Sequence, residues 1–158
     1  ENLILSRIVF VEVIESLNAI KAGKLVTGSI ARVADCCPQP NDPFQCITKL
    51  GGLCSEAEYP TPTGKCIPNQ CEPVLKVKRF LWDIRILKIF LVILFDTVRH
   101  LKNKNESTMV AWIQDSPLFA GLDASRPSFQ EYRGGIYSDA SCSKQAIDHA
   151  VCILTFDQ

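Results

Sequence analysis

Hydrophobic residues recur at helical spacing near the start of the chain. Four apolar positions follow one another at steps of four, three and three residues, namely Phe10, Ile14, Leu17 and Ile20. Glutamate, serine and lysine occupy positions between them. This period aligns apolar side chains on one face of an α-helix, so the pattern predicts a helix over residues 8–22. Gly23 stands where a glycine commonly ends such a helix.

The rest of the chain changes from turns to strands. Residues 34–73 contain most of the nine prolines, so we expect short regular structure there, apart from one helical stretch near residues 44–50. Residues 74–80 alternate between apolar and polar. Residues 117–124 and 149–156 are apolar runs of strand length. Two glycines between aromatic residues in YRGGIY predict a turn.

The most apolar segment, RFLWDIRILKIFLVILFDTV, is too often interrupted by charge to cross a membrane. Its uninterrupted core covers residues 89–95, and aspartate, arginine and lysine break the rest. A spanning helix needs about 20 mostly apolar residues, so we expect a buried element and no membrane span. The same core is uncharged and prone to β-structure, which makes it a predicted aggregation site.

Composition and charge narrow the class of protein. The chain has 158 residues, enough for one domain with a real core. It carries 17 basic and 17 acidic residues and no basic run, so nothing indicates a nucleic-acid partner. The opening ENLILSRIVF lacks a basic n-region, so no signal peptide is visible. We predict no cofactor, and the sequence does not indicate an oligomeric state.

Eight cysteines are a dense set for a chain of this length. Six of them crowd into residues 36–71, among prolines and glycines. Such density indicates a disulfide-stapled region of an exported protein. A zinc site is the weaker interpretation, because paired C-x-x-C knuckles are missing and no histidine lies near. We therefore predict no metal site, and spacing alone leaves the disulfide connectivity open.

The two histidines lie in different surroundings. His100, in the polar stretch VRHLKNKN, is typical of a solvated loop or helix end. His149 follows an aspartate and opens the apolar run HAVCILTF. A histidine at that point either caps a strand or acts as a catalytic base, and the isolated pair favours the structural role.

The stretch GLDASRPSFQEYRGGIYSDASCSKQAIDHAVCILTF contains His149. In the order of its motifs it resembles the C-terminal half of the papain family of cysteine peptidases, in particular its cathepsin L-like group. IESLNAIKAGKLV, VADC and GGLCSEAEYP followed by GKC are similar to the central helix and the disulfide-rich loops. Together these matches cover well over half of the chain, while residues 81–105 match poorly.

The resemblance implies an α+β fold of the papain type, in part. We expect a truncated helical left domain over residues 1–73, with the central helix and the disulfide-rich loops. An incomplete β-barrel-like right domain with the histidine motif is expected over residues 74–158. A barrel that lacks strands leaves open edges, so low stability and a tendency to aggregate are expected.

The resemblance assigns His149 the position of the catalytic base. There the imidazole holds the nucleophilic thiol as a thiolate, because a free thiol with a pKa of ~8.5 is mostly protonated at neutral pH. The family's nucleophilic cysteine would stand near Leu5, at the start of the central helix, but no cysteine precedes Cys36. Ser6 lies one residue away, and a serine nucleophile would need a strong base and an oxyanion hole.

Other parts of the family's machinery are also unmatched. The oxyanion-hole glutamine would lie upstream of Glu1, and the asparagine that follows the histidine would lie after Gln158. The Cys-Asn-Gly-Gly stretch of the substrate cleft is expected before Phe44, where this chain reads CPQPNDP. We therefore expect these 158 residues not to hydrolyse peptides.

Further positions carry roles that the resemblance implies. Gly121 and Ala150 would line the apolar second subsite, and Asp148 would set the local field beside His149. Close strand packing explains Gly121 equally well. The resemblance also pairs Cys36 with Cys66 in a disulfide and gives Cys142 a partner beyond Gln158, while Cys152 is expected in the core. Asn105, in the sequon NES, is a glycosylation site if the chain enters the secretory pathway.

Two hypotheses remain open. The first is a papain-class cysteine endopeptidase acting on peptides or proteins, of which this chain is an incomplete or misassembled form. The second is a non-catalytic papain-like protein that binds peptides or partners, or a pseudogene product without a role. The resemblance implies a lysosomal or secreted location for either.

Overall fold

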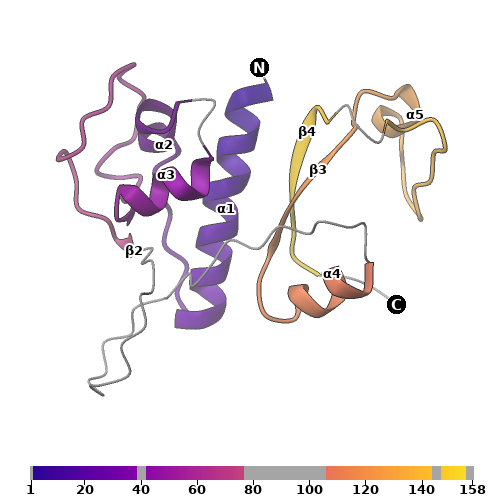
Figure 1. Cartoon of the computed structure of the whole chain (residues 1–158), viewed down its shortest axis with the longest axis horizontal. Helices are drawn as coiled ribbons and strands as arrows, with labels where there is room; N and C mark the ends of the chain where they lie inside the picture. The colour runs from indigo at the N-terminus through magenta and orange to yellow at the C-terminus, as the bar shows by residue number, and fades with distance from the viewer. Residues whose placement is uncertain (1, 39–41, 77–105, 144–146, 156–158) are drawn as a thin grey trace.

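The computed structural model describes residues 2–38, 42–76, 106–143 and 147–155, and for residues 2–6 the backbone alone (Figure 1). Within these ranges, helices are combined with two antiparallel strand pairs, which is an α+β architecture. In chain order the elements are α1 (Asn2–Ala22), α2 (Ile30–Cys36), α3 (Pro43–Lys49), β1 (Gly52–Leu53), β2 (Leu75–Lys76), α4 (Glu106–Ile113), β3 (Leu118–Leu122), α5 (Pro127–Gln130) and β4 (His149–Ile153).

Helix α1 is the central element. It begins at Asn2, six residues before the predicted start, because the residues before Ile8 are mostly good helix formers that continue the apolar character of the helix. Its end agrees with the prediction. Gly23 has a φ of 66°, and its amide donates to the carbonyl of Ala19. The side-chain amide of Asn18 donates to the Lys24 carbonyl at 2.7 Å and holds the departing chain.

Two sides of α1 are buried. Val11 and Ile14 belong to the main core cluster, together with Val33, Cys37, Ile47, Leu53 and Leu75. Val9 and Val13 are also buried, at 7% and 6% exposure, but lie outside that cluster. Residues two apart on a helix point about 200° apart, so these valines face the other side, where β3 and β4 contact α1. Figure 1 shows α1 between helices α2 and α3 on one side and the β3–β4 pair on the other.

Helices α2 and α3 begin at side-chain caps. Ser29 Oγ accepts from the amide of Arg32 at 2.9 Å, and Asp42 Oδ1 accepts from the amide of Phe44 at 2.9 Å. Such caps satisfy amides that have no partner within the helix. The predicted helical stretch near 44–50 is confirmed as α3. Helix α2 is a correction, because we expected a single helical stretch in residues 34–73 and α2 reaches into it.

The pair β1–β2 is very short. Gly52 faces Lys76 and Leu53 faces Leu75 in antiparallel register. Gly52 has a φ of 128°, and a Cβ atom there would lie 2.0 Å from the Leu75 carbonyl oxygen. Only glycine fits this approach. The strand predicted over residues 74–80 is confirmed at Leu75–Lys76, and residues 77–80 lie outside the described part, as does the apolar run 89–95.

The pair β3–β4 matches the predicted apolar runs. The strands are antiparallel, with Leu118 opposite Ile153 and Leu122 opposite His149 at the two ends. Helices α4 and α5 stand in the second half of the chain, where we predicted strands only. The YRGGIY segment turns as predicted, and Gly134 and Gly135 have φ values of 155° and 90°. No helix among the described residues combines the length and apolar character needed to cross a bilayer.

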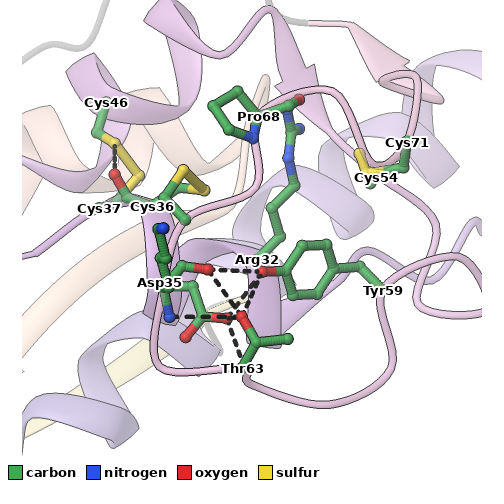
Figure 2. Close-up of a disulfide and its surroundings, with 12 residues drawn as sticks. Arg32, Asp35, Cys36, Cys37, Cys46, Cys54, Tyr59, Thr63, Pro68 and Cys71 are labelled. Carbon is green, nitrogen blue, oxygen red and sulfur yellow. Dashed lines mark hydrogen bonds between the residues drawn. A yellow bond between two sulfur atoms is a disulfide. The ribbon is translucent and has the colours of Figure 1, made fainter.

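Three disulfides staple the loops around α2 and α3 (Figure 2). Cys36 pairs with Cys66, the pairing that the resemblance implied. The spacing left the other two open, and they join Cys37 to Cys46 and Cys54 to Cys71. These bonds close loops of 9 to 30 residues, so each limits the freedom of the unfolded chain. Cys142 and Cys152 are free thiols.

Candidate active site

His149 is the first residue of β4 and is half-buried. It lies opposite Leu122, the last residue of β3. The Asp148 amide donates to the Leu122 carbonyl at 3.2 Å and extends the ladder by one bond. The histidine is therefore held by backbone pairing at the point where the two strands open into loops.

Asp148 is occupied by the neighbouring loop. Its Oδ1 accepts from the amide of Ala124 at 2.7 Å. This bond ties the entrance of β4 to the chain that leaves β3. Asp148 therefore ties the backbone just before His149 to the end of β3 and the residues that follow it, in addition to any effect of its charge.

Asp123 is the residue that the sequence reasoning missed. It is 7% exposed, and its carboxylate accepts from Ser125 Oγ at 2.6 Å, from the Ser143 amide at 2.8 Å and from Arg126 Nε at 3.2 Å. These contacts, led by the Ser125 hydroxyl, lower the pKa of Asp123 to about 2. It thus joins the turn after β3 to the segment that leads toward β4. In the sequence, the Leu-Asp-Ala motif of residues 122–124 is the feature that could have drawn attention to Asp123.

Two of the predicted subsite residues lie together. Gly121 and Ala150 are register partners on β3 and β4. A Cβ atom at Gly121 would lie 2.6 Å from Cγ2 of Ile147, so the Ile147 side chain rests over this glycine. Ile147 is 64% exposed. The structure thus places Gly121 under one exposed apolar side chain, on β3 next to the residue that pairs with His149.

Helix α1 and strand β4 run side by side in the same direction (Figure 1). Phe10 of α1 stacks on Phe119 of β3, the register partner of Cys152, which places Phe10 and Cys152 near the same level. His149 lies three residues earlier on β4, a rise of about 10 Å. On a helix that rise corresponds to about six or seven residues. The start of β4, and with it His149, therefore lies alongside the first turns of α1.

No thiol of the described residues is prepared for attack at this level. Residues 1–35 contain no cysteine. Burial, followed by the charge of Glu12, raises the pKa of Cys152 and keeps it protonated. Cys142 Sγ lies 3.8 Å from the hydroxyl of Tyr137, in the loop that follows α5. His100 and Asn105 lie outside the described residues. Within the described ranges, no three histidine, cysteine or acidic side chains gather as a metal site.

Known proteins resemble this chain in sequence and in fold. The sequence profile of the papain family cysteine proteases matches residues 8–158. Cathepsin 7 of Mus musculus is 30% identical over 148 residues, which cover 86% of this chain and 39% of the relative. Procathepsin L of Felis catus is 29% identical over 148 residues, with coverage of 86% and 39%. The chain thus spans about two fifths of these curated relatives.

Solved structures share the fold. The bromelain protease of Ananas comosus, in complex with the E64 inhibitor, superposes with a TM-score of 0.71 at 21% identity. That match covers 96% of this chain and 65% of bromelain. A cysteine protease of Carica candamarcensis in complex with E-64 gives a TM-score of 0.69 at 24% identity, with coverage of 96% and 66%. The expected papain-like α+β fold, present in part, is confirmed.

Proposed function

Because this chain belongs to the papain family of cysteine proteases, we propose that these 158 residues form a peptidase homologue that is catalytically silent in this form. One observation carries the proposal. Strand β4, which begins at His149, runs beside α1, and residues 1–35, which include α1, contain no cysteine that a base could activate. A histidine without an adjacent nucleophile has nothing to activate.

The chemistry of the alternative nucleophiles also supports the absence of catalysis. Cys152 stands three residues farther along β4 than His149, and burial raises its pKa. A thiolate is the reactive species, so a raised pKa works against it. Ser6 would need a much stronger activation than a thiol, because a hydroxyl is far less acidic. Neither residue replaces the missing cysteine.

The activity of a longer protein is a separate proposal. The chain covers about two fifths of the curated relatives, so a longer form could supply further parts of the site. In that form we propose a cysteine endopeptidase with peptide or protein substrates and His149 as its base. Three disulfides support an exported or lysosomal location, where such bonds persist. We also propose the division into units at residues 1–73 and 74–158.

A non-catalytic peptide-binding role is the second candidate. The pairing of Gly121 with Ala150, with the exposed Ile147 resting over Gly121, favours it. The Ile147 side chain occupies the space over Gly121, so Ile147 itself would offer the apolar surface for a peptide side chain. Binding of an apolar dipeptide without turnover, weakened by Gly121→Leu, would separate this role from a chain that has no ligand.

The first experiment restores the thiol. We expect the unmodified protein neither to cleave an apolar-Arg dipeptide substrate nor to be labelled by E-64. Leu5→Cys should be labelled by E-64, and adding His149→Ala should slow the labelling at least tenfold, because the imidazole no longer stabilises the thiolate. Ser16→Cys, about three turns farther along α1, is the matched control and should be insensitive to His149→Ala.

Two outcomes would overturn the proposal. Hydrolysis by the unmodified protein that is lost on His149→Ala would show a working nucleophile. Equal labelling rates for Leu5→Cys with and without His149 would show that β4 does not bring the histidine to this helix position. A circular dichroism spectrum for each variant shows that the fold is retained.

A further inference from the structure

One surface cavity is bordered by two different disulfides. Its volume is about 290 Å³, and it is lined by Cys36 at the end of α2 and by residues of α3 and its flanks, namely Asp42, Gln45, Cys46, Lys49 and Leu50. Cys36 belongs to the bond with Cys66, and Cys46 belongs to the bond with Cys37. Cys46 Sγ lies only 3.4 Å from the carbonyl oxygen of Cys36 (Figure 2).

The far ends of these disulfides differ in their surroundings. A thiolate that attacks one sulfur expels the other, and the step is faster when the departing thiolate is stabilised. Cys37 is 2% exposed, belongs to the core cluster and ends α2, where burial and the helix dipole both disfavour an anion. Cys66 is half-buried and follows the exposed Lys65. Exchange at Cys36 is therefore favoured over exchange at Cys46.

The loop that carries Cys66 has a second attachment to α2. Asp35 accepts hydrogen bonds from the Tyr59 hydroxyl at 2.8 Å, from the Thr63 amide and hydroxyl at 2.7 and 3.0 Å, and from the Gly64 amide at 3.0 Å. Figure 2 shows these bonds meeting beside the disulfide. We therefore expect the loop to stay attached to α2 when the Cys36–Cys66 bond opens.

The charged residues that line the cavity favour one kind of incoming thiol. Lys49 is exposed and lies one helical turn from Cys46 on α3, so its ammonium is available to an anionic group. Asp42 also lines the cavity, but its Oδ1 accepts from the amides of Phe44 and Gln45 as the cap of α3. An incoming molecule with a carboxylate is thus matched by Lys49.

We propose that this cavity is a thiol-exchange site, where a low-molecular-weight thiol carrying a carboxylate forms a mixed disulfide with Cys36. The incoming thiolate attacks Cys36 Sγ, and the electron pair of the Cys36–Cys66 bond passes to Cys66 Sγ. The Cys66 thiolate then takes a proton from water. One disulfide replaces another, so no further oxidant is needed. This site is independent of the silent or active state of His149.

Peptide mapping tests the site directly. The oxidised 158-residue protein, with Cys142→Ala and Cys152→Ala to remove the free thiols, is treated with reduced glutathione under native conditions. After an acid quench and alkylation, mass spectrometry should find glutathione on Cys36 and the alkyl group on Cys66 first, with an unchanged circular dichroism spectrum. First reaction at another disulfide, or exchange only as the spectrum collapses, would overturn the proposal.

A charge comparison gives a second test. Lys49→Gln should slow the reaction with glutathione about two- to fivefold, the scale of an exposed charge interaction. Cysteamine, which is cationic and has no carboxylate, should react no more slowly with Lys49→Gln than with the parent protein. Lys24→Gln, at an exposed position after α1, is the matched control and should change neither rate. Equal slowing of both thiols by Lys49→Gln would contradict the role of this lysine.

Discussion

Phe10 joins three elements of the fold, so its truncation should be among the most damaging in the chain. Its ring is 9% exposed. It stacks on Phe119 of β3 with centroids 4.3 Å apart and meets the edge of Phe44 of α3 at 4.6 Å. Phe10→Ala would therefore leave a cavity that faces the helical part and the β3–β4 pair together.

The expected cost follows from the size of that cavity. A buried phenylalanine truncated to alanine costs about 3–5 kcal/mol. Part of this is the loss of two aromatic pairs, each worth about 0.5–1.5 kcal/mol beyond the buried area. A domain commonly has about 5–15 kcal/mol of stability in total, so the loss is a large fraction. Phe119 is 38% exposed, so Phe119→Ala should cost less, about 1–2 kcal/mol.

Urea unfolding followed by circular dichroism measures these values. The set comprises Phe10→Ala, Phe119→Ala and the double variant. Phe129→Ala is included for comparison, because Phe129 is a half-buried ring of α5 that meets the ring of Tyr137. The double variant should cost less than the sum of the single ones by about 0.5–1.5 kcal/mol, because the two rings share a contact. Strict additivity, or a cost below about 1 kcal/mol for Phe10→Ala, would refute the bridging role.

Three further outcomes are expected. Gly52→Ala should cost more than 2 kcal/mol in urea unfolding, because its Cβ would meet the Leu75 carbonyl, whereas Gly64→Ala, also at positive φ but with open space, should cost about 1 kcal/mol. The pKa of Asp123 is lowered to about 2, so the stability that its carboxylate contributes should be complete above pH ~4 and lost as pH falls toward ~2. Asp123→Asn should remove that contribution to the pH dependence of the melting temperature. Burial raises the pKa of Glu15, so its contribution to stability should be present below pH ~4.5 and lost as pH rises through the folded-state pKa. Glu15→Gln should abolish that decline. A decline in Glu15→Gln as large as in the unmodified protein would contradict this prediction.

The sequence predicts the elements whose residues repeat with a clear period. Helix α1 and strands β3 and β4 follow from apolar spacing, and α3 from a short stretch between turns. Helix α2 was not predicted because one of its buried residues is Arg32, 3% exposed, which breaks any apolar period. The Arg32 guanidinium donates to the carbonyls of Gly52 at 3.3 Å and Pro68 at 3.2 Å, and burial lowers its pKa. Such partners come from distant loops and leave no local pattern.

The candidate site divides in the same way. The position of His149 follows from the Asp-His motif at the head of an apolar run. The role of Asp123 does not, because its partner Ser143 lies 20 residues away and comes near only when β3 and β4 pair. The level of His149 against α1 also depends on tertiary packing, since it rests on how β4 lies along the helix. The sequence thus indicates which residue types form the candidate site, but it does not indicate how they are placed relative to one another.

The scaffold and the chemistry of this fold are separable. Val11 and Val13 are buried on opposite sides of α1, so the helix is fixed between its neighbours by residues well past Leu5. Backbone pairing with Leu122 and the bond from Ala124 to Asp148 fix the other side of the site at His149. None of these contacts involves a nucleophile. This fold therefore holds His149 in place without a cysteine in α1, which is why introducing a cysteine at Leu5 is a fair test of geometry.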